Sequence, residues 1–598
     1  MGIVFEVLFC YNFVSKQLKT DAMKRNLLLA MTFTIAMICG AQTPWNGTVA
    51  ETYNGGDGTP ENPFQIATAE QLALLAQQTN NGTGGDVNYM LTNDIVLNDG
   101  DSLLWTPIGN IGVFSGVFDG NGHIISGLYE NGNKISGLFA STENAIIKNT
   151  ILENATVLEY EQAYVYSAIG GILVGKAKNT NILDCSVDGL IEIFSAKPSG
   201  GLVGQFETDI NDTVFIKNCV NYAMVTENEC TGGIAGKTNS SNSNLVIDNC
   251  VNHGSINGWS FSGGMIGMVG NGAFIIKNCD NYGEIVSEGT AGGMAGQGGL
   301  NCSITNCFNH ESGSVTGGMN TGGIIGTAIT TVMSCCGNAA LLTGINDDEI
   351  MVGGISGADG TIYNCFNRGD LTAVFTDDNP LLIQMGGISS TPPTDGYVRN
   401  VYNAGTIIKP TNTNIQSKWY GYIVPALFSD TLIKNCYWTG EEYLITEHVY
   451  NLTTNNWVLL PNSTRFSPGA TASSWLLKAQ QYGTYDLIEA LNAGAMGQCV
   501  WVEDTEGINE GLPIPRSSHY VEVEEQQTDG LLVYPNPTDG NITITSANGT
   551  DYRISNLLGQ TVQSGRFDGA YQQVDVSSLP GGIYFITVGG TTTKFMKR

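Results

Sequence analysis

A short phrase returns about every thirty residues along most of this 598-residue chain. It reads Gly-Gly, an aliphatic residue, a variable residue and usually Gly, and Ile-x-Asn-Cys-x-Asn follows later in the same unit. The Gly pairs begin at Gly170, Gly200, Gly232, Gly263, Gly292, Gly322, Gly353 and Gly386. A fixed period of this length is typical of a solenoid, in which each unit packs only on its neighbours.

The columns around the repeated Cys have a consistent physical character. Three positions before each Cys the residue is always apolar, and the Cys column itself contains Cys219, Cys250, Cys279, Cys307, Cys336, Cys365, Val401 as a replacement, and Cys436. Both columns can face inward only if the chain bends between them, because positions three apart on a straight strand face opposite ways. The Asn before the Cys, as in Asn278 and Asn306, suits this bend because Asn tolerates the left-handed conformation. A second Asn column, two residues after the Cys, predicts the next corner.

Each unit therefore holds short strands joined by corners, with no amphipathic helical stretch between them. This pattern predicts a parallel β-helix, and crossovers between parallel strands are overwhelmingly right-handed. The expected fold is all-β: a right-handed parallel β-helix solenoid with capped ends, followed by a small C-terminal β-sandwich.

The Gly phrases also carry a family resemblance. Gly-Leu-Val-Gly from Gly201, Gly-Ile-Ala-Gly from Gly233 and Gly-Met-Ile-Gly from Gly264 resemble the GLUG motif of bacterial secreted surface proteins. The resemblance covers roughly residues 50–515, and it is specific for architecture rather than for activity. It implies an exported surface protein built on a parallel β-helix.

The solenoid needs capped ends, since an unpaired strand edge invites pairing with another chain. At the N-terminal end, Thr68 to Gln71 forms a capping box before helically spaced Leu and Ala residues. We expect an N-terminal cap and first GLUG coils over 42–165 and the GLUG-repeat β-helix over 166–440. Residues 441–525 lose the repeat and are expected to form a C-terminal cap or a small separate domain.

The N-terminus predicts export. From Met23 the chain has a basic start, an apolar run to Ile38 and a small-residue cleavage site ending at Ala41. Residues 1–22 are therefore expected to be a mis-assigned start and residues 23–41 a signal peptide. The apolar run is shorter than the roughly 20 residues of a membrane span, so no transmembrane segment is expected. Bulky Ile38 before Cys39 argues against a lipid anchor, which lipoprotein-type signals place after a small residue.

Residues 529–598 change character to short alternating strands, such as 541–545 and 583–588, that predict a small β-sandwich. Their motifs resemble the C-terminal sorting domain of the type IX secretion system of Bacteroidetes. The resemblance implies that the type IX machinery is a partner and that the protein reaches the outer-membrane surface or the extracellular space. The residues that carry this sorting signal are Pro535, Asn536, Pro537, Gly559, Gly582, Tyr584 and Lys597.

Charge limits the partners. Lys and Arg total 25 against 55 Asp and Glu, giving a net charge of −30. Nucleic acid is excluded as a partner because phosphate binding needs a basic stripe. No cofactor is expected; calcium is the one metal that an acidic surface leaves open, although no EF-hand or calcium nonapeptide repeat is present.

Fourteen Cys residues occur in this exported chain, yet their placement does not predict a disulfide framework. Cys residues in one column of adjacent coils lie about 4.8 Å apart with parallel side chains, which does not match disulfide geometry. We expect a reduced ladder of small core residues. Cys230, Cys302, Cys335 and Cys499 lie outside the column, and their pairing remains open.

Three consecutive coils have long links before the Gly pair, at 339–352, 372–385 and about 408–420, and stacking places these predicted loops side by side. They combine acidic and aromatic residues, a composition suited to glycan binding. The predicted function is a non-catalytic adhesion or binding protein for a glycan or a host surface protein; the alternative is a polysaccharide lyase or glycoside hydrolase. The candidate ligand-binding residues are Asp347, Asp348, Phe375, Asp377, Asp378, Trp419 and Tyr420.

Overall fold

The structure is a computed structural model of the chain. It describes residues 43–517 and 532–597 except for 101–102, 160–167, 196, 209–212, 239–242, 271, 378–379, 395, 412–413, 426–432, 440–447, 452–455, 460–472, 475–477, 481–482, 484–485, 498, 506, 508, 535–539, 546–550, 557–559, 567–570, 581 and 589–590. The predicted start (1–22) and signal peptide (23–41) lie outside the described residues. The chain divides into two compact units, Met1–Arg516 and Ser517–Arg598.

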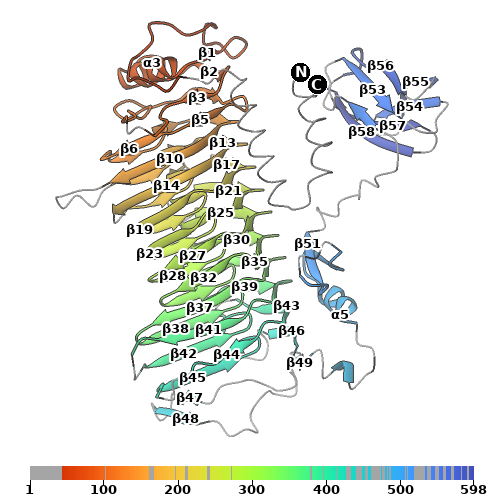
Figure 1. The fold of residues 1–598 in the computed structure, drawn as a ribbon. Helices are drawn as coiled ribbons and strands as arrows, with labels where there is room; N and C mark the ends of the chain where they lie inside the picture. Colours follow the sequence, from red (N-terminus) through yellow and green to blue (C-terminus); the bar gives the residue numbers. More distant parts are fainter. Residues whose placement is uncertain are drawn as a thin grey trace, which may run out of the picture. The chain divides into compact units, whose positions relative to one another are not determined.

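The first unit is a parallel β-solenoid (Figure 1), which confirms the predicted fold. Strands of successive coils pair in parallel, and the apolar column keeps its register from Ile216 through Ile247 and Ile276 to Ile304. The strands that carry this column are β4 (Val117–Asp119), β9 (Ile146–Lys148), β13 (Asn181–Leu183), β17 (Thr213–Lys217), β21 (Ser243–Asp248), β25 (Gly272–Lys277), β30 (Cys302–Thr305), β35 (Val332–Ser334), β39 (Thr361–Tyr363), β43 (Val398–Asn403) and β46 (Ile433–Trp438).

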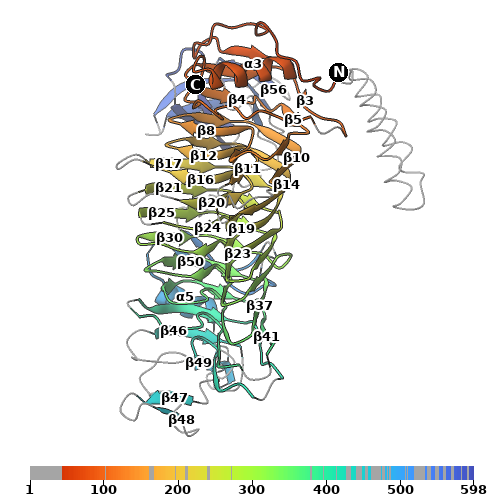
Figure 2. The same ribbon diagram turned by 90° about the vertical axis from the view of Figure 1, so that its left-hand side faces the viewer.

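Further strands complete each coil. The segments that lead into the Gly pairs, and the equivalent segments of the first and last coils, form a second ladder: β7 (Ile135–Ser136), β11 (Ile169–Gly171), β15 (Ser199–Gly200), β19 (Met224–Gly232), β23 (Ile256–Gly263), β28 (Thr290–Gly292), β33 (Asn320–Gly322), β38 (Glu349–Gly353), β42 (Leu382–Gly386) and β45 (Ser417–Gly421). A seven-stranded sheet, stacked in Figure 2, closes the coil with β8 (Phe139–Glu143), β12 (Val174–Lys178), β16 (Val203–Glu207), β20 (Ala235–Thr238), β24 (Ile266–Met268), β29 (Ala295–Gln297) and β34 (Ile325–Thr327).

The predicted left-handed corners are confirmed. The backbone φ angle is 55° at Asn218, 53° at Asn249, 56° at Asn278 and 54° at Asn306. The Asn side chains also link neighbouring coils, since Asn306 Nδ2 donates to Asn278 Oδ1 at 2.9 Å. The corner therefore combines a backbone conformation that Asn tolerates with a side-chain hydrogen bond along the solenoid axis.

The second Asn column forms a buried amide ladder, which the expected corner did not include. Asn221 Nδ2 donates to Asn252 Oδ1, and the same 2.8 Å bond repeats from Asn252 to Asn281 and onward to Asn403. The second amide hydrogen is also used, because Asn252 Nδ2 donates to Gly254 O at 3.0 Å. These side chains are buried, so their pairing removes the cost of placing amides inside the protein.

The Cys column is buried in the core as a stack of free thiols, which confirms the predicted reduced ladder. Each thiol points to main-chain oxygen; Cys219 Sγ lies 3.2 Å from Lys217 O. Burial raises the pKa of the Cys219 thiol well above its usual range, so this thiol stays protonated and unreactive.

Helix α3 (Ala69–Asn80) covers the N-terminal end of the solenoid (Figure 2). Thr68 is its N-cap and accepts from Gln71 N at 3.4 Å, as the sequence predicts. Leu72, Leu75 and Ala76 enter the solenoid core. The first strands, β1 (Phe64–Ile66) and β2 (Asn88–Leu91), pair in parallel and join the main sheet.

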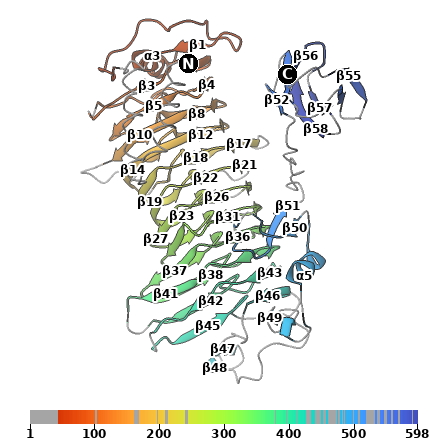
Figure 3. The same ribbon diagram turned by 45° about the vertical axis from the view of Figure 1, so that its right-hand side comes forward.

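The segment from about residue 486 to 517, here called the lateral segment, lies against the side of the coils (Figure 3). It contains α5 (Leu487–Gly494), β50 (Cys499–Val502) and β51 (Ile514–Ser517). Leu491, Trp501 and Ile514 pack on outward-facing aromatic rings of three coils, Phe366, Tyr402 and Tyr437. Tyr402 OH donates to Pro513 O at 2.6 Å, and Arg368 forms ion pairs of 2.8 Å with Glu311 and Glu510.

A disulfide joins Cys335 to Cys499 and fastens the lateral segment to the solenoid. Cys335 occupies a corner with φ 53°, where other coils have Asn. Cys230 and Cys302 are buried and free. The pairing that the sequence left open is therefore settled for Cys335 and Cys499.

The second unit consists of two small antiparallel sheets, as predicted. Ile542, Ile554, Val574, Tyr584 and Ile586 come from both sheets and form one core. The strands are β52 (Leu532–Tyr534), β53 (Asn541–Thr545) and β56 (Tyr571–Asp575) in one sheet, and β54 (Asp551–Asn556), β55 (Thr561–Arg566), β57 (Gly582–Val588) and β58 (Thr591–Lys597) in the other.

We predict that Asn278→Val lowers the free energy of unfolding by about 1 to 3 kcal/mol, because a β-branched residue is strained at φ 56°. Asn278→Gly is the matched control, since it loses the same side-chain hydrogen bonds but adopts this φ freely. Urea unfolding followed by circular dichroism compares the two variants. Equal destabilisation by Val and Gly would show that the side-chain bonds, and not the backbone conformation, set the cost.

Candidate functional site

The coils that carry the candidate site are extended mainly by strands. The sequence predicts long loops here, but β37 (Leu341–Asn346) pairs with β41 (Leu371–Phe375) from Leu342 and Leu371 to Asn346 and Phe375. After the turn that follows each of these strands, β38, β42 and β45 pair in the same order. The alternation of buried and outward residues along β37 explains the difference, because such alternation supports a strand with one buried face. The predicted side-by-side arrangement of the three coils is confirmed.

The acidic residues of the first turn hold the coils together. Asp347 accepts a hydrogen bond from Thr376 Oγ1 of the next coil. Asp348 Oδ1 and its main-chain oxygen both accept from Leu381 N at 3.0 Å. Both carboxylates are exposed, so they remain accessible to a partner while bracing the turns. Asp377 is exposed in the following turn, and Asp378 lies outside the described residues.

The aromatic candidate residues are more buried than expected from the composition of the predicted loops. Trp419 is 8% exposed and Tyr420 is 4% exposed, since both belong to β45 and pair with β42. Phe375 is half-buried and packs against the core. Lys409 Nζ lies 5.0 Å from the centre of the Tyr420 ring. Tyr420 and Phe375 pack with the solenoid core, whereas Trp419, the strand neighbour of Tyr420, is buried on the other side of β45.

Exposed aliphatic side chains form the feature that the sequence reasoning missed. Ile345 and Val374 are adjacent in register, and Thr372 of the same strand pairs with Ile408 in β44 (Ile407–Ile408) of the next coil. Leu341 and Ile345 share one side of β37 because they are four residues apart. Five aliphatic side chains are between 41% and 48% exposed: Leu341, Ile345, Val374, Leu381 and Ile408.

We call these five side chains together with Asp347, Asp348 and Asp377 the apolar–acidic face. It covers β37, β41 and β44, which lie one below another in Figure 1. One sequence pattern could have predicted this face: consecutive coils have an apolar residue at outward positions where earlier coils have Thr or Ser. Exposed aliphatic groups that gather in this way are a mark of an interaction surface.

No three His, Cys, Asp or Glu side chains converge to hold a metal ion within the part of the chain that the structure describes. Among those same residues, no helix is both long and apolar enough to cross a membrane.

The sorting-signal residues are distributed over the second unit. Gly582 begins β57, Tyr584 is buried in its core and donates to Pro580 O at 2.8 Å, and Lys597 ends β58 and is buried. Pro535, Asn536, Pro537 and Gly559 lie outside the described residues.

Comparison with known families identifies this second unit. The family model of the secretion system C-terminal sorting domain matches residues 532–598. The domain places the protein at the outer-membrane surface or outside the cell, and it implies interaction with the type IX secretion machinery.

The solenoid shares shorter stretches with curated proteins. Halomucin of Haloquadratum walsbyi is 35% identical over 127 residues, which are 19% of this chain and 1% of halomucin. A protein of Evansella cellulosilytica provisionally named a Gly-rich membrane protein is 32% identical over 141 residues, 22% of this chain and 16% of that protein. The chain thus spans only a small fraction of these relatives' lengths.

Among solved structures, one chain from Bacteroides ovatus, provisionally described as an immunoglobulin A1 protease, is similar with a TM-score of 0.34 and 18% sequence identity. The match covers 54% of this chain and 80% of that chain.

Glu130 is the buried carboxyl group with a strongly shifted pKa among the described residues. It lies in β6 (Tyr129–Asn131) and is fully buried. Burial raises its pKa to about 8, although Gly137 N donates to Oε1 at 2.8 Å and Asn133 Nδ2 donates to Oε2 at 3.2 Å. Asn133 lies between β6 and β7 and Gly137 directly follows β7, so we assign Glu130 a structural role in holding this stretch of chain.

We predict that Glu130 makes the protein less stable as pH rises from about 4.5 to about 8. The folded-state pKa exceeds the unfolded value, so the charge is disfavoured in the fold, by on the order of 5 kcal/mol when ionisation is complete. Glu130→Gln should raise the thermal midpoint at pH 8 and leave it nearly unchanged near pH 4.5. Exposed Glu153→Gln is the control and should change neither value. A pH-independent effect of Glu130→Gln would contradict the assignment.

Proposed function

We propose that this protein is an exported adhesion protein that binds a partner through the apolar–acidic face and does not catalyse a reaction. The observation that carries this proposal is the row of exposed aliphatic side chains on three consecutive coils, bordered by acidic turns. Solvent-exposed apolar area of this kind favours association, because contact with a partner removes it from water.

The acidic turns define the partner's chemistry. Asp347, Asp348 and Asp377 are exposed beside the aliphatic row, in a chain whose net charge is −30. A protein surface with apolar side chains flanked by Lys or Arg would complement both features. We therefore propose a protein partner for this face.

Two observations favour binding by this face over catalysis and over glycan stacking. Asp347 and Asp348 are engaged in hydrogen bonds that hold adjacent turns, whereas a glycosidase pair flanks a scissile bond. Trp419 and Tyr420, the aromatic residues suited to stacking on a sugar, are buried in β45.

We predict that Val374→Asp weakens binding at least about tenfold, because it places a charge at the centre of the apolar row. Ile275→Asp is the matched control: Ile275 is also exposed, at 38%, but it lies on β25 in a different part of the solenoid. Binding of the exported protein to immobilised extracellular matrix proteins and mucins is measured by surface plasmon resonance, with a glycan array in parallel. Added salt should also weaken the contact, since the acidic turns contribute electrostatic attraction.

Unchanged affinity of Val374→Asp for every ligand of the wild type would refute the assignment of the face. Saturable, salt-independent binding to glycans alone would replace the protein partner by a glycan. Turnover of a polysaccharide during these assays would move the protein to the class of enzymes.

Export provides a separate prediction. Deleting residues 529–598 in a host with type IX secretion should leave the chain in the periplasm, because the predicted signal peptide directs transport only across the inner membrane. Cell fractionation and protease accessibility measure the outcome. Fusing 529–598 to a periplasmic reporter is the converse test and should bring the reporter to the surface. Surface delivery of the truncated chain would show that export does not depend on this unit.

A further inference from the structure

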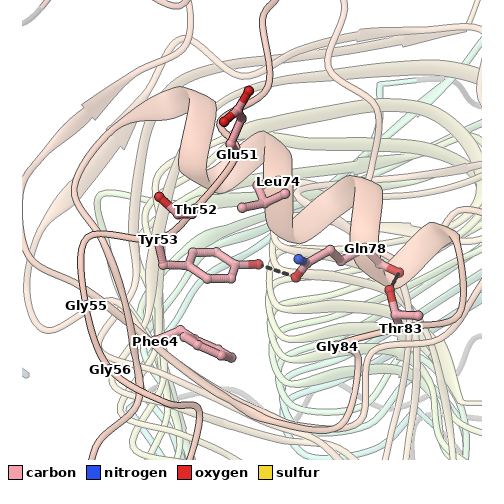
Figure 4. Close-up of a pocket in the computed structure, with 10 residues that line it drawn as sticks. All are labelled: Glu51, Thr52, Tyr53, Gly55, Gly56, Phe64, Leu74, Gln78, Thr83 and Gly84. Atoms are coloured by element: carbon pink, nitrogen blue, oxygen red, sulfur yellow. Dashed lines mark hydrogen bonds between the residues drawn. The ribbon is translucent and has the colours of Figure 1, made fainter.

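The N-terminal cap contains a pocket of about 450 Å³ that the proposed adhesion does not use (Figure 4). It lies between residues 51–56, helix α3 and the turn at Thr83 and Gly84. Its volume falls within the range of sites that bind small molecules. It is well removed from the apolar–acidic face along the solenoid, since the cap is at the N-terminal end and β37 is many coils away (Figure 1).

Main-chain hydrogen bonds hold the pocket in shape. Ala50 N donates to Glu70 O at 3.0 Å and ties the incoming chain to α3. Asn54 N donates to Gln65 O at 2.9 Å, and Gln65 N donates to Gly55 O at 2.8 Å. The walls are therefore preformed, which reduces the entropy that a ligand must overcome on binding.

One side of the pocket is apolar and aromatic. The rings of Tyr53 and Phe64 are stacked, with centroids 4.7 Å apart and planes at 29°. Leu74 of α3 lies on the opposite side of Tyr53 from Phe64 in Figure 4. Both rings are half-buried, and because they stack on each other, the ring edges outside this contact are the surface left for a ligand. Such a surface suits the apolar C–H face of a saccharide ring.

Polar side chains also line the pocket, with Gln78 next to the Tyr53 hydroxyl and Thr52 near the other end of Tyr53 (Figure 4). Tyr53 OH donates to Gln78 Oε1 at 2.7 Å and fixes the orientation of the amide (Figure 4). No described residue accepts a hydrogen bond from Gln78 Nε2, so this donor is available to a ligand. The exposed hydroxyl of Thr52 and the carboxylate of Glu51 line the pocket as well. Burial keeps the Tyr53 hydroxyl protonated by raising its pKa.

Charge narrows the ligand class. None of the 10 residues that line the pocket is Lys or Arg, and Glu51 is the one charged group among them. An anionic ligand such as a uronate or a phosphate would find no compensating charge there. A neutral ligand with hydroxyl groups and an apolar ring face would complement both the aromatic side and the polar residues of the pocket.

We propose that this pocket binds a neutral saccharide, with one sugar ring against Tyr53 and Phe64 and its hydroxyl groups toward Gln78, Thr52 and Glu51. This assignment goes beyond the proposed adhesion, which uses a different surface and a protein partner. It gives the exported chain a second point of recognition, at the N-terminal end of the solenoid.

The test is saturation-transfer-difference NMR on the full exported protein with four neutral probes, the methyl glycosides of glucose, galactose, mannose and N-acetylglucosamine. Methyl glucuronide is the anionic comparison. At least one neutral glycoside should bind at millimolar concentration, as expected for a single sugar ring, with the strongest transfer to its ring protons. Methyl glucuronide should give no transfer.

Thr52→Trp should abolish the transfer, because Thr52 is exposed and an indole there fills the pocket mouth without disturbing the core. Gln78→Leu should weaken binding about tenfold by removing the amide donor. Glu61→Trp is the matched control, since Glu61 is exposed on the same segment but does not line the pocket. Val374→Asp should leave saccharide binding unchanged, which separates this site from the adhesion face.

Absence of transfer from all four neutral glycosides would overturn the proposal, as would equal transfer in Thr52→Trp and the wild type. Equal binding of methyl glucuronide would overturn the assignment of a neutral ligand. A thermal midpoint measured for each variant verifies that the cap is folded, and Thr52→Trp decides the outcome if Gln78→Leu destabilises α3.

Discussion

The packing of buried Asn amides against the Gly pairs is the contact on which the rest of the solenoid depends. Each amide bonds to the equivalent amide of the next coil at 2.8 Å. The second Gly of each pair leaves the space for it: a Cβ at Gly233 would lie 2.4 Å from Asn252 Oδ1, and a Cβ at Gly264 would lie 2.5 Å from Asn281 Oδ1. The two motifs of the repeat therefore form one structural unit. The extended coils that carry the apolar–acidic face have their additional residues between the second Asn of one unit and the Gly pair that follows it.

A break in the corner column provides the attachment point of the lateral segment. Cys335 replaces the corner Asn and forms the disulfide with Cys499, while the next corner residue, Asn364, donates to Met496 O at 2.6 Å. Gly337 leaves room for the neighbouring rings, since a Cβ there would lie 2.2 Å from Phe366. Aromatic side chains that face outward from the coils thus become buried under Leu491 and Trp501. One local departure from the repeat allows a non-repeating segment to pack on the solenoid.

Acidic residues stabilise turns as well as setting the surface charge. Asp348 accepts main-chain hydrogen bonds from the next coil, and Asp248 lies 3.5 Å from Lys277 on a neighbouring strand. A charged group held in this way adds little stability at the surface, because water screens it. It does fix where the charge lies, and this makes the acidic border of the apolar–acidic face a defined feature for a partner to recognise.

The sequence by itself determined the features that repeat or are local. Its period predicted the parallel coils, Asn278 and Asn306 predicted left-handed corners, the Cys column predicted a reduced stack, and the capping box at Thr68 predicted α3. These inferences succeed because backbone conformation and side-chain alternation are set by neighbouring residues and are repeated in every coil. Only the tertiary structure decided that the second Asn column is a buried ladder, that Trp419 and Tyr420 are buried, and that Cys335 pairs with Cys499 across 164 residues. The same holds for the pocket formed by Tyr53, Phe64 and Gln78, because each of these features depends on which distant side chains the coils bring into contact, and no local pattern in the chain records that choice.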